Sequence, residues 1–169
     1  MKTYPRTRYL AESAMIAALY LLFTLVTYGF ANGVVQLRLS EALAVLPYFT
    51  PAAIPGLTVG CLLANLTGGC APWDIVFGTL ATLIGAVLAR LLRKRALLAP
   101  IPNILSNTLI IPFVLRYVYG APDALPFLFL SIGASEVLSS GVLGIGLLCL
   151  LRPYAPRLFT NPKEPNDKE

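Results

Sequence analysis

Long runs of Ala, Leu, Val, Ile and Phe constrain the fold of this chain more than any motif does. Hydrophobic residues make up 57% of the 169 residues and charged residues only 12%, against about 25% charged residues in an average soluble domain. A soluble fold of this size cannot bury so much apolar surface. The chain is therefore predicted to be an all-α integral membrane protein with one domain, residues 1–160. The polar tail, 161–169, is predicted to be disordered.

Four apolar runs are long enough to cross a bilayer, which takes about 20 apolar residues. They cover residues 9–30, 74–92, 101–119 and 125–151. The block 40–66 contains Pro47, Pro51 and Pro55, and each of these would interrupt a single helix. The block is therefore predicted to form two helices, 39–49 and 52–66, with a turn at Thr50-Pro51. The first of these is too short to span a bilayer and is expected to pack inside the bundle.

The basic residues support a count of six helices. They cluster before residue 9, between residues 90 and 95, and after residue 151. With six crossings all three clusters lie on one side, leaving only Arg38 and Arg116 on the other side. The positive-inside rule then places both termini in the cytoplasm. Basic residues spread over three loops are not typical of a nucleic-acid site, so we expect a multi-pass cell-membrane protein with no nucleic-acid partner.

The residue types that are absent exclude most enzyme classes. There is no His, which excludes imidazole catalysis and His-ligated metals. The three Cys residues show no CxxC spacing, and the internal acids, Glu12, Glu41, Asp74 and Glu136, are scattered. We therefore predict no metal, no cofactor and no enzymatic activity. A membrane-embedded enzyme and a stand-alone channel or small transporter remain as alternatives.

The polar island Gln36–Glu41 stands out between apolar runs. Ionisable residues are rare in lipid and usually face a partner, a cavity or a substrate. Arg38 and Glu41 fit an ion pair at a helix start as well as they fit a ligand-binding role. The six-helix topology puts this island at the outer mouth of the bundle, not at mid-membrane.

Glu136 is the most deeply placed acid. It lies about 12 residues into its helix and, at about 1.5 Å per residue, roughly 18 Å deep. No Lys or Arg is expected at that depth, so the carboxylate needs a distant Arg, a proton or a ligand that donates hydrogen bonds. We favour the ligand, with Ser139 nearby on the same helix. Asn103 and Ser106, near the inner end of the fifth helix, are predicted to be structural.

Small residues one helical turn apart form three ridges. Gly56, Gly60 and Ala64 on the third helix, and Ala81, Gly85 and Ala89 on the fourth, favour packing within the bundle. Ala14 and Ala18 on the first helix fit either packing within the bundle or contact with a second protein. Their spacing does not separate these two possibilities.

Three segments of the chain resemble one transporter family. They are the stretch Leu37–Leu57, in which Arg38-Leu-Ser-Glu-Ala-Leu43 followed by Leu46-Pro47 is the specific part, the stretch Gly60-Cys-Leu-Leu-Ala-Asn65, and the stretch Asp74-Ile-Val-Phe-Gly-Thr-Leu-Ala-Thr82. These segments resemble the QueT-type family, the substrate-binding S components of energy-coupling factor (ECF) transporters assigned to queuosine precursors. The resemblance covers nearly the whole membrane region.

The resemblance implies partners that the residues alone do not show. An S component is a six-helix bundle that holds a micronutrient in its outward half. It docks on a transmembrane coupling protein through an Ala-x-x-x-Ala surface, here Ala14 and Ala18, and two cytoplasmic ATPases supply the energy. The chain has no Walker motif, which agrees with an external source of energy.

The resemblance also implies a substrate of the 7-deazaguanine class: queuosine, queuine or a precursor. The Watson–Crick edge of such a base offers an N–H and an amino group, and a carboxylate accepts both in parallel. Glu136 is our first candidate for that carboxylate and Glu41 the second. Asn107 or Asn65 would bind the carbonyl oxygen, Trp73 would stack on the ring, and the loop 29–37 would act as a lid. Asn65 also fits a helix–helix hydrogen bond and Trp73 an interfacial anchor. An S component for a flavin- or thiamine-like vitamin is the nearest alternative.

Overall fold

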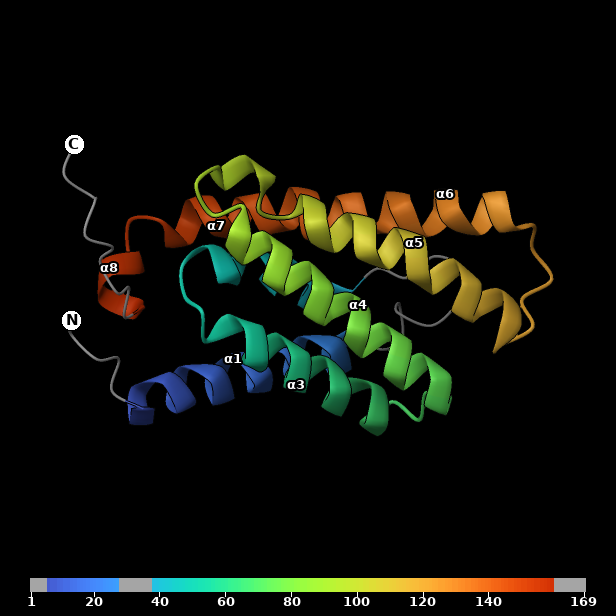
Figure 1. The fold of residues 1–169 in the computed structure, drawn as a ribbon, viewed down its shortest axis with the longest axis horizontal. Helices are drawn as coiled ribbons and strands as arrows, with labels where there is room; N and C mark the ends of the chain where they lie inside the picture. Colours follow the sequence, from blue (N-terminus) through green and yellow to red (C-terminus); the bar gives the residue numbers. More distant parts are fainter. Residues whose placement is uncertain (1–5, 28–37, 160–169) are drawn as a thin grey trace.

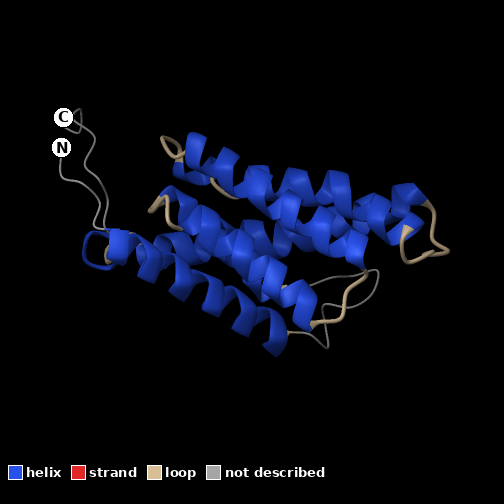
Figure 2. Cartoon of the chain, turned by 60° about the horizontal axis from the view of Figure 1, so that its bottom comes forward, coloured by secondary structure: helices blue, strands red, loops and turns tan. Residues whose placement is uncertain are grey.

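The computed structural model describes residues 6–27 and 38–159, which form helices joined by short loops, with no strand in that part of the chain (Figures 1 and 2). The order of elements is α1 (Arg6–Val26), η1 (Leu39–Tyr48), α3 (Ala53–Thr67), α4 (Pro72–Leu91), η2 (Ala96–Leu98), α5 (Ile101–Tyr117), α6 (Leu125–Glu136), η3 (Val137–Leu143), α7 (Gly144–Leu151) and α8 (Ala155–Leu158). The lid segment 29–37 and the tail 161–169 lie outside the described residues.

Four helical segments in this part of the chain are long and apolar enough to cross a membrane: Arg6–Val26, Pro72–Leu91, Ala96–Tyr117 and Leu125–Leu151. Two shorter apolar helices, Leu39–Tyr48 and Ala53–Thr67, lie between the first two of them in the sequence. The predicted break at Thr50-Pro51 is confirmed, because η1 ends at Tyr48 and α3 begins at Ala53. The chain is thus an all-α multi-pass membrane protein. A count of six crossings and the orientation of the termini remain predictions.

The short helix η1 is a 3-10 helix enclosed by the rest of the bundle. Its ten residues, at about 2.0 Å per residue, span about 20 Å, less than the roughly 30 Å of a bilayer core. Residues 40–47 are all buried, against α1, α3, α4, α7 and η3. The prediction that this helix packs inside the bundle is confirmed. Because η1 has neighbours on all sides, its apolar residues are buried all the way around the helix.

Side chains from distant parts of the chain secure the C-terminal end of η1. Arg90, in the last turn of α4, donates to the carbonyl oxygens of Pro47 and Tyr48 at 3.1 and 3.4 Å. Phe49 stacks on Phe159 with ring centroids 5.3 Å apart, and Thr50 donates to Glu12 at 2.9 Å. The start of α1, the α4–α5 connection and α8 therefore gather at one end of the bundle, on the left in Figure 1. The described basic residues of the three predicted clusters lie in these segments or next to them.

The glycine ridges on α3 and α4 pack inside the bundle, as predicted. A Cβ atom added at Gly60 would lie 2.7 Å from Cβ of Tyr20, and one added at Gly85 would lie 2.8 Å from Oδ1 of Asn103. The ridge on α1 differs, because Ala14 and Ala18 are exposed. The buried face of α1 carries Ser13, Ile16, Ala17, Tyr20 and Thr24. Packing of Ala14 and Ala18 within the bundle is therefore not found.

Candidate functional site

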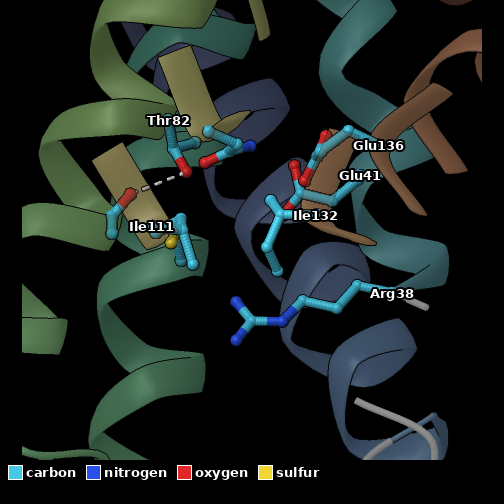
Figure 3. A pocket seen from close by; sticks show the side chains of 9 residues that line it. Arg38, Glu41, Thr82, Ile111, Ile132 and Glu136 are labelled. Atoms are coloured by element: carbon cyan, nitrogen blue, oxygen red, sulfur yellow. Dashed lines mark hydrogen bonds between the residues drawn. The ribbon is translucent and has the colours of Figure 1, made fainter. Parts of the chain in front are cut away.

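A small pocket lies in the interior of the bundle, where residues from four α-helices and the start of η1 meet. It is lined by Arg38, Glu41, Cys61, Gly78, Thr82, Asn107, Ile111, Ile132 and Glu136. In Figure 3 the carboxyl groups of Glu41 and Glu136 lie together on one side, opposite Thr82 and Ile111, and the side chain of Arg38 extends in from below. Four residues predicted from the sequence as ligand contacts, Arg38, Glu41, Asn107 and Glu136, are therefore brought together.

The two acids share one amide group. Nδ2 of Asn103 donates to Oε2 of Glu41 at 2.9 Å and lies 3.3 Å from Oε2 of Glu136. Oε1 of Glu41 accepts a 2.6 Å hydrogen bond from the hydroxyl of Tyr20. Glu41 is 4% and Glu136 8% exposed. The prediction that Glu41 lies at an outer mouth, apart from Glu136, is wrong, because η1 runs through the middle of the bundle and brings the two carboxylates side by side.

Arg38 is the cation of this pocket. It is half-buried just before η1, and its Nε atom is buried without a hydrogen-bond partner. The described residues contain no Arg38–Glu41 ion pair, since the ion pair found there joins Arg8 to Glu12. The interpretation of these two residues as an ion pair at the helix start is therefore wrong. Arg38 also lines the pocket of Glu136, which fits the alternative that a distant Arg reaches this acid.

Asn103 is the residue that the sequence interpretation missed. It was predicted to be structural, yet it is 1% exposed and contacts both acids. The sequence signal that could have identified Asn103 was its spacing from Asn107, because residues four apart on a helix share a face. Asn107 lines the pocket with its Nδ2 atom buried and unpartnered. Ser106 donates to the carbonyl of Pro102 at 2.5 Å, which fits the structural role predicted for it.

The remaining predicted contacts lie outside the pocket lining. Trp73 is 62% exposed and stacks on Phe77, with centroids 6.1 Å apart, so its ring does not face the acids. Asn65 is buried behind the pocket wall, where Nδ2 lies 3.6 Å from Sγ of Cys61. Ser139 is 1% exposed and its hydroxyl has no hydrogen-bond partner in the described part of the chain, but it does not line the pocket.

The pocket is narrow in this conformation. Its free volume is about 10 Å³, room for about one water molecule. Its walls are mixed: Ile111, Ile132 and Cys61 are apolar, whereas the hydroxyl of Thr82 donates to the carbonyl of Gly78 at 3.1 Å. A ring-sized ligand enters only if the lining side chains move apart. Chemically, the site can accept hydrogen bonds at the acids and donate them from Arg38 and Asn107.

Comparison with known proteins identifies the family. A family model described as "QueT transporter" matches residues 10–153, which covers the bundle from α1 to α7. The Queuosine precursor transporter QueT of Lactococcus lactis subsp. cremoris (strain MG1363) is 33% identical over 85 residues, which is 48% of this chain. The match spans about half of that relative, 49% of its length. No solved structure matches the chain. The resemblance seen in the sequence is confirmed by the family model, and the chain belongs to the QueT transporter family.

Proposed function

We propose that this protein is the S component of an ECF transporter, which captures a queuosine precursor of the 7-deazaguanine class from outside a bacterial cell. Family membership and the name of the partly aligned relative support this proposal. In this proposal the bundle crosses the cytoplasmic membrane six times with both termini inside. It performs no chemistry on its cargo.

The paired acids are the observation that carries the choice of substrate. Two carboxylates buried side by side, with one half-buried Arg nearby, form a site that needs hydrogen-bond donors. The donor edge of a 7-deazaguanine supplies an N–H and an amino group to one carboxylate, as a charge-assisted pair. We assign that role to Glu136, because both oxygens of Glu41 already accept hydrogen bonds from Tyr20 and Asn103.

The donors of the pocket suit the rest of such a base. Nδ2 of Asn107 is buried and unpartnered, and leaving such a donor unpaired costs about 1–3 kcal/mol. The carbonyl oxygen of the base would satisfy it. Arg38, which also lines the pocket, supplies a second donor. The narrow free volume requires that these side chains separate when the ring enters.

Transport requires partners that supply energy. Ala14 and Ala18 are exposed on α1, and small exposed residues let a partner helix approach closely. We propose that this face docks on a transmembrane coupling protein and that two ATPase subunits bound to that protein drive uptake. A stand-alone transporter would instead move its cargo without those subunits.

Binding to the purified protein tests the substrate. Isothermal titration with queuine and 7-aminomethyl-7-deazaguanine, and with riboflavin and thiamine for comparison, should give binding to a deazaguanine alone. Glu136→Gln and Glu136→Ala should each weaken that binding at least tenfold, about the contribution of one hydrogen bond to a charged group. Asp123→Asn, which makes the same change outside the pocket, is the matched control. Unchanged affinity in both Glu136 variants would remove Glu136 from the site. Binding of riboflavin or thiamine in place of a deazaguanine would show that the proposed substrate is wrong.

A further inference from the structure

Four buried side chains from four helices form one hydrogen-bonded chain. Tyr20 of α1 donates to Glu41 of η1 at 2.6 Å, and Asn103 of α5 bridges Glu41 to Glu136 of α6 at 2.9 and 3.3 Å. Each of the four is at most 8% exposed. The pocket residue Glu136 is therefore connected to α1 through polar contacts alone.

The chemistry of the amide fixes the direction of these contacts. A carboxylate only accepts hydrogen bonds, so the NH₂ group of Asn103 must face the acids, and its two hydrogens can serve both of them. The hydroxyl of Ser140, 3.4 Å from the same nitrogen, is the longest of the three contacts. Both oxygens of Glu41 are engaged in this network, whereas only Oε2 of Glu136 is. Oε1 of Glu136 is the one carboxylate oxygen that takes no part in this network, and Glu136 lines the pocket.

A glycine on the neighbouring helix α4 leaves the space that Asn103 occupies. Gly85 of α4 lies directly against Asn103, where an added Cβ would be 2.8 Å from Oδ1 and 2.9 Å from Cα. Real Cβ atoms do not approach so closely, so only Gly at this position leaves room for α5 to bring Asn103 to the acids. Two helices thus meet closely at the point where the amide is held.

We infer that Asn103 is a positioning residue for substrate recognition: it holds the carboxylate of Glu136 in the orientation that reads the donor edge of the base, and Tyr20 holds Asn103 through Glu41. This inference rests on the proposed function. Without Asn103, Glu136 keeps its carboxyl group but loses its fixed direction. It then loses its ability to distinguish a base with two donors on that edge from a base with one.

The test compares two ligands that differ by one donor, 7-deazaguanine and its analogue without the 2-amino group, 7-deazahypoxanthine. The wild-type protein should prefer the first by roughly tenfold to a hundredfold, the range for a hydrogen bond to a charged group. Asn103→Ala should reduce this preference to about threefold or less. Ser106→Ala removes a polar group from the same helix, one that bonds only to that helix's own backbone, and should keep the preference.

Each outcome decides one of the two proposals. Wild-type protein that binds neither base contradicts the proposed function itself. A wild-type preference near one, or a preference unchanged in Asn103→Ala, overturns the positioning role. If Asn103→Ala does not fold, Tyr20→Phe decides, because it removes the 2.6 Å hydrogen bond to Glu41 and keeps the ring. It should reduce the preference in the same direction, and an unchanged preference would overturn the inference.

Discussion

A methyl group added at Gly60 should both destabilise the bundle and loosen the pocket. The Cβ of Gly60→Ala would lie 2.7 Å from Cβ of Tyr20 and 3.0 Å from the carbonyl oxygen of Ala17. Carbon atoms in contact are normally about 3.5–4.0 Å apart, so α1 must retreat by about 1 Å. Overpacking of this kind costs about 1–3 kcal/mol.

The same displacement reaches the acids. The hydroxyl of Tyr20 lies 2.6 Å from Glu41, and a retreat of about 1 Å would lengthen this contact to about 3.6 Å, beyond a hydrogen bond. Glu41 would then lose its donor from α1. Affinity for the deazaguanine should therefore fall severalfold, although Gly60 itself does not line the pocket.

Thermal unfolding of the purified protein in detergent, followed by circular dichroism, measures the first effect. A chain of this size shifts by about 2–4 °C per kcal/mol, so Gly60→Ala should lower the midpoint by roughly 2–12 °C. Gly146→Ala is the matched control, because a Cβ at that helical position meets nothing within 4 Å. Its midpoint should stay or rise, since Ala favours a helix over Gly. Equal midpoints for Gly60→Ala and wild type, or equal losses in both variants, would refute this reasoning.

Three further predictions separate the roles of individual residues. Glu41→Gln should weaken deazaguanine binding less than Glu136→Gln does, because Glu41 acts through Asn103; titration showing the larger loss in Glu41→Gln would reverse the two roles. Ala18→Leu should leave binding to the purified protein unchanged but reduce uptake of labelled ligand into cells at least tenfold, because the bulkier side chain blocks the exposed face of α1; normal uptake would count against docking there. Trp73→Ala should change the affinity less than twofold, because the ring lies on the surface against Phe77, and a tenfold loss would return Trp73 to the site.

The helices could be predicted from the sequence because local features define them. The prolines at positions 47, 51 and 55 predicted the division into η1 and α3, and the run 125–151 is one continuous helical segment in the structure. Glycine spacing predicted that α3 packs closely within the bundle. These features depend on residues close together in the chain, so the spacing of residue types was sufficient to predict them.

The partners of the acids could not be predicted in the same way. The depth given to Glu41 assumed that its helix begins at the membrane surface, whereas residue 40 onward is already buried. A helix that is apolar on all sides has no periodicity to indicate which face meets which neighbour. The contact between Asn103 and Glu41 spans 62 positions in the sequence, and only the assembly of the whole bundle brings these two side chains together.

The two irregular helices meet where the polar network lies. The 3-10 helix η1 carries Glu41, and the π-helical turn η3 begins directly after Glu136. Glu136, Ser140 and Gly144 follow one another at intervals of four, and all three are buried. A Cβ at Gly144 would lie 3.0 Å from Val45 of η1, so the two segments pack closely. Irregular backbone at membrane depth is tolerated only where protein or a cavity covers it, and π turns are frequent at functional sites. The irregular helical geometry of η1 and η3 therefore lies in the covered centre of the bundle. This irregular backbone lies where two acids share one amide.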